Sequence, residues 1–197
     1  MEIFETIMTR RSTRKYKRKP VQREVIEKIV EAGRFAPSGG NSQSIHFIVV
    51  TNKDVLDELA ESVENQFSKM EITKGMYRSL ARSVAASKAG RYRYDYDAPV
   101  LIITTNHKEC RNNIADCSCA LENMMLAANE LNLGSCWVNQ LWWLNDNDVI
   151  LKHLYELGME QSESVYGALV VGYPDTESGM PNRNILQRIG NKVTYVE

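Results

Sequence analysis

Two short apolar segments constrain the fold of this chain most. Residues 99–105 read PVLIITT, and residues 165–173 read VYGALVVGY. Both have the length and composition of strands, and strands that are apolar along their whole length are usually buried on both faces. The sequence therefore predicts a sheet in the interior of a layered domain.

Further strands and helices alternate with these two segments. Short β-rich runs predict three more strands, at residues 45–51, 133–139 and 192–196. Apolar residues at helical spacing predict helices within residues 3–8, 25–30, 56–67, 114–131 and 149–154. Gly33 is expected to end the second helix, and Asn145 or Asp146 to cap the last one. This interleaved order predicts one α+β (mixed α/β) domain over residues 1–197.

The composition is that of an ordinary globular domain. Hydrophobic residues make up 43% and charged residues 25% of the chain, and the formal net charge is −1. A near-neutral molecule has no general attraction for nucleic acid or anionic lipid. No apolar stretch is long enough to span a bilayer, the N-terminus lacks the order of a signal peptide, and nothing about the four cysteines implies secretion. We therefore expect reduced thiols in a cytoplasmic protein.

A run of seven basic side chains lies within residues 10–19, RRSTRKYKRK. Three interpretations stay open: a solvated face, an arm that binds nucleic acid, or a clamp for phosphate. The overall charge and the lack of an aromatic-rich platform weigh against nucleic acid. Arg10, Ser12 and Arg14 alternate, so an extended turn presents them on one side, and guanidinium groups fit phosphate oxygens in pairs.

A polar loop, APSGGNSQ, occupies residues 36–43 between a predicted helix and a predicted strand. It is a good turn in any protein. Ser38, Asn41 and Gln43 also bring three hydrogen-bonding side chains together, and the two adjacent glycines allow a ligand to approach the backbone. Amide side chains carry a donor and an acceptor in one plane, which suits the edge of a heterocycle better than a bare phosphate.

No side chain is marked as a catalytic acid, base or nucleophile, and no metal site is predicted. Cys117 and Cys119 diverge on a predicted helix, and the three histidines follow no ligand pattern. Motifs of serine hydrolases, zinc proteases, P-loop proteins and dinucleotide-binding folds are absent from the sequence. Trp142 and Trp143 are expected in the core, with a pocket wall for a flat ligand as the alternative.

Taken in order, the motifs resemble the nitroreductase-like flavoprotein family. The matching segments are RRSTR, FAPSGGNSQSIHFIVV, DAPVLIITT, DCSCALENMMLAANELNLGSCWVN, ALVVGYP and the final PNRN...NKVTYVE. The resemblance covers nearly the whole chain. It implies a central mixed sheet flanked by helices and an intertwined homodimer with two FMN sites at the subunit interface. It also implies electron transfer from NADH or NADPH through FMN to an oxidised substrate.

The resemblance also assigns the cofactor-binding residues. The basic turn would bind the phosphate and ribityl chain through Arg10, Arg11, Ser12 and Arg14, and Arg14 would reach the pyrimidine edge of the ring. The other subunit would contribute Pro37, Ser38, Gly39, Asn41 and Gln43. The far side of the ring would meet Cys136, Trp137, Val138, Asn139 and Gln140, and Arg183 would lie near the phosphate.

The sequence departs from the family pattern in two places, and one further segment is variable in the family. Pro181 stands where many members have a lysine, so Arg188 is a candidate replacement at the phosphate. Ser44 and Ile45 replace proline and tryptophan in the polar loop. Residues 70–97 occupy the place of the family's variable lid.

The resemblance implies a ping-pong reaction with an electron-poor acceptor such as a nitroaromatic or a quinone. No catalytic side chain is obligatory, since the flavin carries the chemistry. Alternatives within the fold are a flavin reductase, a reductive dehalogenase, a flavin-degrading enzyme or a tailoring dehydrogenase. The remote alternative is a basic-arm module that binds nucleic acid.

Overall fold

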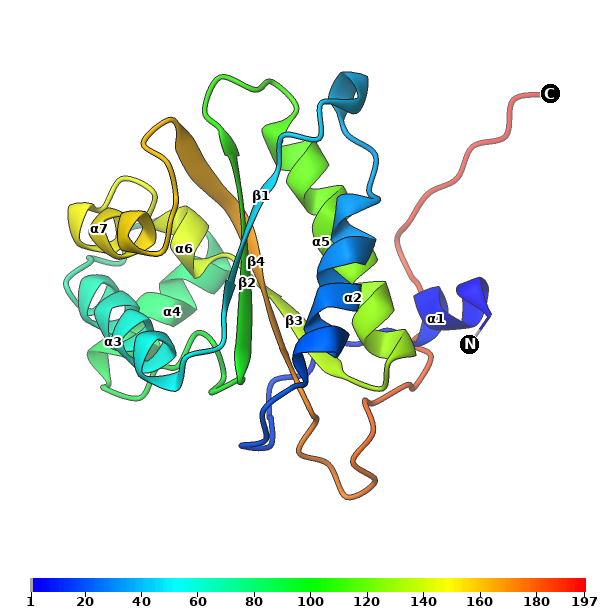
Figure 1. Cartoon of the computed structure of the whole chain (residues 1–197), viewed down its shortest axis with the longest axis horizontal. Coiled ribbons are helices and arrows are strands. Elements are labelled where there is room, and N and C mark those ends of the chain that lie inside the picture. The colour runs from blue at the N-terminus through cyan, green and yellow to red at the C-terminus, as the bar shows by residue number, and fades with distance from the viewer. Residues whose placement is uncertain (1) are drawn as a thin grey trace.

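A four-stranded sheet forms the centre of the molecule (Figure 1). The computed structural model describes residues 2–197. The strands lie in the order β1-β2-β4-β3, with bounds His46–Val50 for β1, Val100–His107 for β2, Gly134–Val138 for β3 and Glu163–Gly172 for β4. The two central strands, β2 and β4, contain the two most constraining segments of the sequence, and nearly all of their residues are buried.

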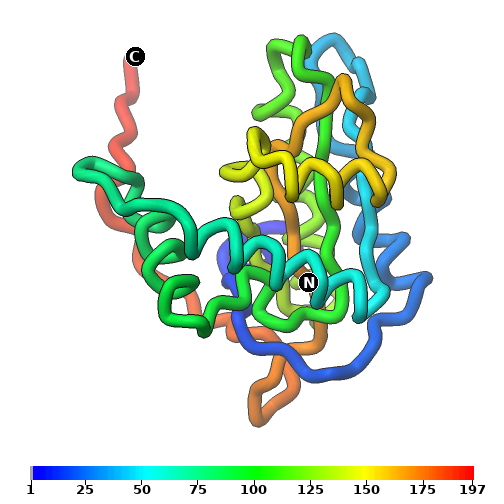
Figure 2. Tube along the Cα trace, turned by 90° about the vertical axis from the view of Figure 1, so that its left-hand side faces the viewer, coloured from blue at the N-terminus to red at the C-terminus, as the bar shows by residue number. Residues whose placement is uncertain are grey.

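Helices cover both faces of the sheet (Figures 1 and 2). One face carries α2 (Arg23–Arg34) and α5 (Asn113–Glu130). The other carries α3 (Lys53–Ser68), α4 (Arg78–Lys88), α6 (Gln140–Trp143) and α7 (Asp148–Glu156). The short α1 (Ile3–Thr9) lies on the outer side of α5, and the one-turn 3₁₀ helix η1 covers Gly39–Asn41. This three-layer arrangement confirms the α+β fold class.

The strand pairings are all antiparallel within the sheet. The mixed sheet that the family resemblance implied is therefore not seen within these four strands. A parallel pairing occurs in the described chain as an isolated bridge between Ser12 and Ser135, outside the pairings of the four strands. There the basic turn runs beside the edge strand β3. The register of β2 with β4 shifts between Thr104 and Thr105, opposite Gly167 and Val165, so Tyr166 is the extra residue on β4.

One hydrophobic core lies between the sheet and the pair α2 and α5. Ile29, Leu121 and Met124 are fully buried there. Gly33 lies inside α2, which ends at Arg34, so Gly33 is not the helix stop that the sequence predicted. A Cβ at Gly33 would lie 2.9 Å from Cγ of Met124. Glycine at this position therefore permits the close approach of α2 to α5.

The second core lies between the opposite face of the sheet and the helices α3, α4, α6 and α7. It includes Phe67, Val84 and Tyr94, each almost completely buried. Residues 70–97 form α4 and a following loop, and this loop contributes Tyr94 to the core. The role of these residues as a lid stays a prediction.

Two further expectations are corrected. The last helix is capped by Asn147, which accepts hydrogen bonds from the amides of Val149 and Ile150. Asn145 instead bonds the backbone of Val165 on β4 with both ends of its amide. The strand expected at residues 192–196 does not form: residues 181–197 have no helix or strand and extend away from the sheet (Figures 1 and 2).

Candidate functional site

The basic turn is fixed against the start of β3. The amide of Thr13 donates to the carbonyl of Ser135 at 2.8 Å, next to the bridge between Ser12 and Ser135. A Cβ at Gly134 would lie 2.6 Å from three side-chain atoms of Thr13. The glycine therefore lets the turn lie directly on the strand, and two segments more than 120 positions apart in the sequence become one surface.

The groups that influence the pKa of Cys136 on β3 identify side chains that lie near this surface. Burial raises the pKa of the Cys136 thiol, and nearby Arg14, Ser12 and Arg10 oppose the shift without reversing it. All three residues of the predicted alternating set therefore lie near Cys136. That they share one face stays a prediction. A thiol with a raised pKa stays protonated at neutral pH, so Cys136 is not an activated nucleophile.

Arg11 is the least satisfied cation of the turn. Its Nη1 donates to the carbonyl of Arg10 at 2.6 Å, but its Nε and Nη2 are buried and have no hydrogen-bond partner within residues 2–197. Burial, followed by the positive charges of Arg188 and Arg10, lowers the pKa of Arg11. Arg188, the candidate replacement at the phosphate, thus lies close to Arg11. Arg10 pairs with Glu122 at 3.5 Å. This group of arginines has the composition of an anion site.

Arg183 lies at the last turn of α5. Its Nη2 donates to the carbonyl of Asn129 at 2.6 Å and to Oδ1 of Asn132 at 2.8 Å. The side chain of Asn129 in turn donates to Oγ1 of Thr9, which directly precedes Arg10. Arg183 therefore anchors the C-terminal segment beside the basic turn. Its predicted contact with phosphate is untested.

The end of β3 and the residues that follow it are held by side-chain hydrogen bonds. Nε1 of Trp137 donates to Oδ1 of Asn139 at 2.6 Å, and Nε2 of Gln140 donates to the hydroxyl of Tyr92 at 2.6 Å. Val138 is buried between them. Oε1 of Gln140 is buried and has no partner within residues 2–197. An unpaired buried acceptor of this kind calls for a ligand or a solvent molecule.

The polar loop forms a different pocket. Its backbone is turned by Gly40, Asn41 and Gln43, all with positive φ, and the Ser38 hydroxyl accepts a hydrogen bond from the amide of Gln43 at 3.0 Å. Pro37, Ser38, Asn41 and Gln43 line a cavity of about 460 Å³ together with residues of α2 and β1. The loop therefore brings together the hydrogen-bonding side chains that the sequence predicted.

The basic turn and the polar loop lie at opposite ends of α5 (Figure 1). The loop is tied to its first turn, where the amide of Gly39 donates to Asp116. The helix α1, which leads into the basic turn, is tied to its last turn through Asn129. Thirteen residues separate Asp116 from Asn129, so the two tethers are roughly 20 Å apart. The two predicted halves of the site are thus attached at different ends of α5, although Arg10 of the turn reaches Glu122 near the middle of the helix.

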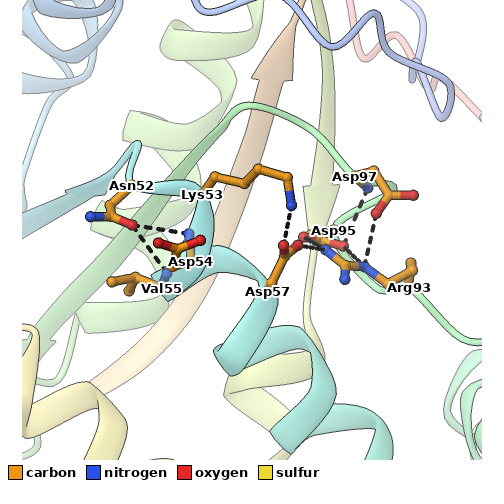
Figure 3. A network of polar contacts seen from close by, with 8 residues as sticks. All are labelled: Asn52, Lys53, Asp54, Val55, Asp57, Arg93, Asp95 and Asp97. Atoms are coloured by element: carbon orange, nitrogen blue, oxygen red, sulfur yellow. Dashed lines mark hydrogen bonds and ion pairs between the residues drawn. The ribbon is translucent and has the colours of Figure 1, made fainter.

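A second cavity, of about 330 Å³, contains none of the predicted residues. Arg93 lies on its wall and joins three carboxylates, those of Asp57, Asp95 and Asp97 (Figure 3). Lys53 pairs with the same Asp57. Apolar residues such as Leu56 and Val100 form the rest of the lining.

Two findings bear on other kinds of site. Within the described chain, no three His, Cys, Asp or Glu side chains are grouped so that they could hold a metal ion. No helix of residues 2–197 has the length and hydropathy needed to cross a membrane.

The layered architecture defines the fold class of the protein. It superposes on a nitroreductase of Bacteroides fragilis solved with bound FMN, with a TM-score of 0.84 and 34% identity over the whole of both chains. A nitroreductase of Desulfitobacterium hafniense has the same fold, with a TM-score of 0.81 over 100% of this chain and 99% of that one. At 23% identity, the second comparison concerns the fold alone.

The chain belongs to the nitroreductase family, whose sequence model matches residues 7–173. A relative from Archaeoglobus fulgidus with the provisional name NADH dehydrogenase/NAD(P)H nitroreductase is 33% identical over 177 residues, 89% of this chain and 87% of the relative. Iodotyrosine deiodinase 1 of Rattus norvegicus is 29% identical over 103 residues, 52% of this chain and 36% of the deiodinase. The family resemblance seen in the motifs is thereby confirmed, and the protein is classed as an oxidoreductase.

Sequence reasoning did not find two residues that contact the predicted site, Tyr92 and Tyr96. Tyr92 bonds Gln140, and the ring of Tyr96 lies 6.0 Å from the guanidinium carbon of Arg14. Both belong to residues 70–97, whose sequence has no clean helical stripe and aligns poorly with the family pattern. The clustering of tyrosines there was the one available signal.

Proposed function

We propose that this protein binds FMN and transfers electrons from NADH or NADPH to an electron-poor acceptor such as a nitroaromatic or a quinone. The observation that carries the proposal is the guanidinium of Arg11. Two of its nitrogens are buried without a partner in the described chain, and Arg10 and Arg188 add positive charge beside it. A phosphate monoester supplies both the acceptors and the negative charge that this group needs.

The residues of the basic turn fit the phosphate end of FMN. Arg10, Arg11 and Ser12 would hold its oxygens, with Arg188 in place of the lysine that Pro181 replaces. Bound FMN supplies the hydride and electron transfer, and the donor and the acceptor use it in turn. Arg14 would place a positive charge where negative charge develops, and a fixed cation there favours the reduced state.

The remaining groups act by binding and orientation. Trp137, Asn139 and Gln140 would line the ring from one side, and the amide of Gln140 is already directed by Tyr92. Ser38, Asn41 and Gln43 would meet the polar edge of the ring with donors and acceptors. The neutral thiol of Cys136 takes no part in proton or group transfer.

We further propose that the protein works as a homodimer in which the polar loop of one subunit completes the site of the other. The separation of the loop and the basic turn along α5 supports this arrangement. Exposed apolar side chains on α1 and on the C-terminal segment support it too, because their burial against a second subunit would remove apolar surface from water. They include Phe4, Met8, Ile189 and Val196. The four free cysteines favour a cytoplasmic location.

The test begins with the colour of the purified protein. We expect flavin absorption, or uptake of added FMN by the apoprotein with a Kd that titration can measure. A colourless protein that takes up no FMN would contradict the proposal. Oxidation of NADH and NADPH is then followed with a nitrofuran, a quinone and free FMN as separate acceptors. Turnover only with free FMN would favour a flavin reductase.

Reductive dehalogenation is the second candidate. It is favoured by the match of 52% of this chain to an iodotyrosine deiodinase. Release of iodide from iodotyrosine by the reduced protein, without comparable turnover of the nitrofuran, would select this function. The same flavin-binding residues serve both reactions, so binding data alone do not separate them.

A further inference from the structure

The loop of residues 92–97, between α4 and β2, contacts two of the side chains assigned to the flavin. Tyr92 contacts Gln140, and Tyr96 contacts Arg14. The loop itself carries none of the assigned cofactor residues. It therefore has the geometry of a support for the site.

The hydroxyl of Tyr92 determines how the amide of Gln140 is oriented. The hydroxyl of Ser83 donates to the carbonyl of Ser79 at 3.1 Å, so its single proton is used. The hydroxyl of Tyr92, 2.7 Å from Oγ of Ser83, must then donate to it. The oxygen of Tyr92 is left as an acceptor and takes the bond from Nε2 of Gln140 at 2.6 Å. The direction of these successive hydrogen bonds determines that Nε2 of Gln140, and not Oε1, faces Tyr92.

This orientation leaves Oε1 of Gln140 as the free end. The residue is 8% exposed, and Oε1 has no partner within residues 2–197. A buried acceptor without a donor costs free energy, so it is retained where a ligand or solvent donor completes it. Rotation of the amide would put two acceptors face to face at Tyr92. The hydrogen-bond chain thus keeps an acceptor available at the site.

Tyr96 acts on Arg14 through its ring. The guanidinium carbon of Arg14 lies 6.0 Å from the ring centroid, within the range of a cation–π contact. Tyr96 and Asp97 both have positive φ, 54° and 55°, an unfavourable conformation for side chains that are not glycine. Strain of this kind persists only where the surroundings enforce it. Here it turns the loop so that Tyr96 faces Arg14.

Side chains of α3 hold the loop in this conformation through hydrogen bonds. The amide of Tyr92 donates to Glu64 at 2.8 Å, and Nη2 of Arg93 donates to Asp57 at 2.9 Å. Arg93 also binds Asp95 and Asp97 of the loop itself (Figure 3). Tyr94 between them is buried in the core. Both ends of the short loop are therefore held, and the two tyrosines project from a rigid support.

We infer that Tyr92 and Tyr96 are positioning residues of the flavin site, Tyr92 acting through Gln140 and Tyr96 acting through Arg14. The inference rests on the proposed function, because the role of Gln140 and Arg14 does. It assigns to residues 92–97 a fixed supporting role within the segment that the family resemblance treats as variable.

The experiment measures FMN binding to apoprotein by quenching of flavin fluorescence. Tyr92→Phe removes only the hydroxyl, and we expect Kd to rise roughly three- to ten-fold, the effect of one hydrogen bond. Tyr94→Phe is the matched control, because its hydroxyl makes no hydrogen bond in the described structure. We expect its Kd to equal that of the parent protein. Urea unfolding of each apoprotein checks that the variants are folded.

A double-mutant cycle separates positioning from general destabilisation. If Tyr92 acts through Gln140, Tyr92→Phe adds nothing in a Gln140→Leu background. For Tyr96→Leu we expect a more negative midpoint potential of bound FMN, and no further change when Arg14→Ala is already present. Additive effects in both cycles, or an unchanged Kd for Tyr92→Phe, would overturn the inference while FMN binding by the parent protein still upholds the proposed function. Absence of FMN binding by the parent protein would overturn both.

Discussion

The backbone amide of Gly39 donates a hydrogen bond of 3.0 Å to Oδ1 of Asp116, and this bond holds the polar loop at the first turn of α5. A Cβ at Gly39 would lie 2.0 Å from Nδ2 of Asn112, so the loop lies directly on the start of that helix. The basic turn is held at the other end of α5. The proposed homodimer takes the loop from one subunit and the turn from the other, which makes subunit composition a testable property.

Mixing two variants that each bind FMN weakly tests the shared site. Arg11→Ala damages the basic turn, and Gln43→Ala damages the polar loop. If each site takes one element from each subunit, a mixed dimer contains one intact and one doubly altered site. After unfolding and refolding the variants together, about a quarter of the sites should be intact by random pairing. FMN titration and sedimentation measure this. Refolding either variant alone is the control, and no recovery in the mixture would place both elements in one subunit's site.

Replacement of Arg11 is expected to weaken FMN binding with little effect on the stability of the apoprotein. Arg11→Ala removes a charge-assisted contact with phosphate, so the Kd for FMN should rise roughly ten- to a hundred-fold. The apoprotein should lose little stability, since the half-buried side chain lies near Arg10 and Arg188 and has two buried nitrogens that are unpaired in the described chain. Arg18→Ala, an exposed change in the same basic run, should alter neither quantity. An equal loss of affinity in both variants would point to a diffuse charge effect.

Contact between Gly134 and Thr13 predicts that Gly134→Ala is destabilising. The new Cβ would lie 2.6 Å from the Thr13 side chain, and the backbone of Thr13 is held by Ser135. We expect a loss of about 1–3 kcal/mol in the free energy of unfolding, as for overpacking in a core. FMN affinity should fall as well, because the basic turn is displaced. Combining the change with Thr13→Gly should recover part of both losses. Gly190→Ala, where no atom lies within 4 Å, is the control for packing, although its φ of 89° adds strain.

The lowered pKa of Glu163 leads us to expect that the free energy of unfolding falls in acid. Burial raises the pKa of Glu163, but hydrogen bonds from His46, the Glu160 amide and Thr105 outweigh burial and hold the pKa below its ordinary value. A carboxyl with a lowered pKa stabilises the fold above its unfolded pKa of about 4.3 and loses this contribution as pH falls through the lower, folded pKa. Unfolding free energy should therefore decline in that window. Glu163→Gln should flatten the decline, whereas Glu160→Gln, at an exposed position, should leave it unchanged.

Arg93 is expected to matter far more for stability than its neighbour Lys53. Arg93→Ala leaves the carboxylate of Asp95, 2% exposed, without its guanidinium partner, and such a loss typically costs about 3–5 kcal/mol. The side chain of Lys53 is 75% exposed, and exposed pairs contribute about 0–1 kcal/mol. Urea denaturation of Arg93→Ala and Lys53→Ala measures the difference. Arg93→Ala combined with Asp95→Asn should recover stability, because the buried charge is then removed. Similar midpoints for the two single variants would contradict this account.

The sequence predicted helices and strands well where the pattern of apolar residues is clear within one segment. The apolar runs at β2 and β4 needed burial on both faces, and their alternation with helical stripes required a layered domain. The alternation of Arg10, Ser12 and Arg14 predicts that these side chains face one side, because an extended chain has a period of two, and all three lie near Cys136. The cap of α7 shows where prediction from local sequence fails. Asn145 and Asn147 both suit a helix cap, and only their tertiary partners determine that Asn147 takes this position.

Contacts between distant segments depend on packing and had no signal in the sequence. Gly33 appeared to be a helix stop, yet it is needed for the approach of α2 to Met124. Tyr92 and Tyr96 lie in a segment without periodicity, and only the folded loop directs them toward Gln140 and Arg14.

For this protein, then, the sequence by itself determined the four strands of the sheet and most of the helices, the family, and the kinds of side chain in the polar loop and the basic turn. Only the tertiary structure decided where those two segments lie. The loop and the chain leading into the turn are attached at opposite ends of α5, by Asp116 near its start and by Asn129 near its end. Hydrogen bonds between residues far apart in the chain make these attachments, and no local pattern encodes them.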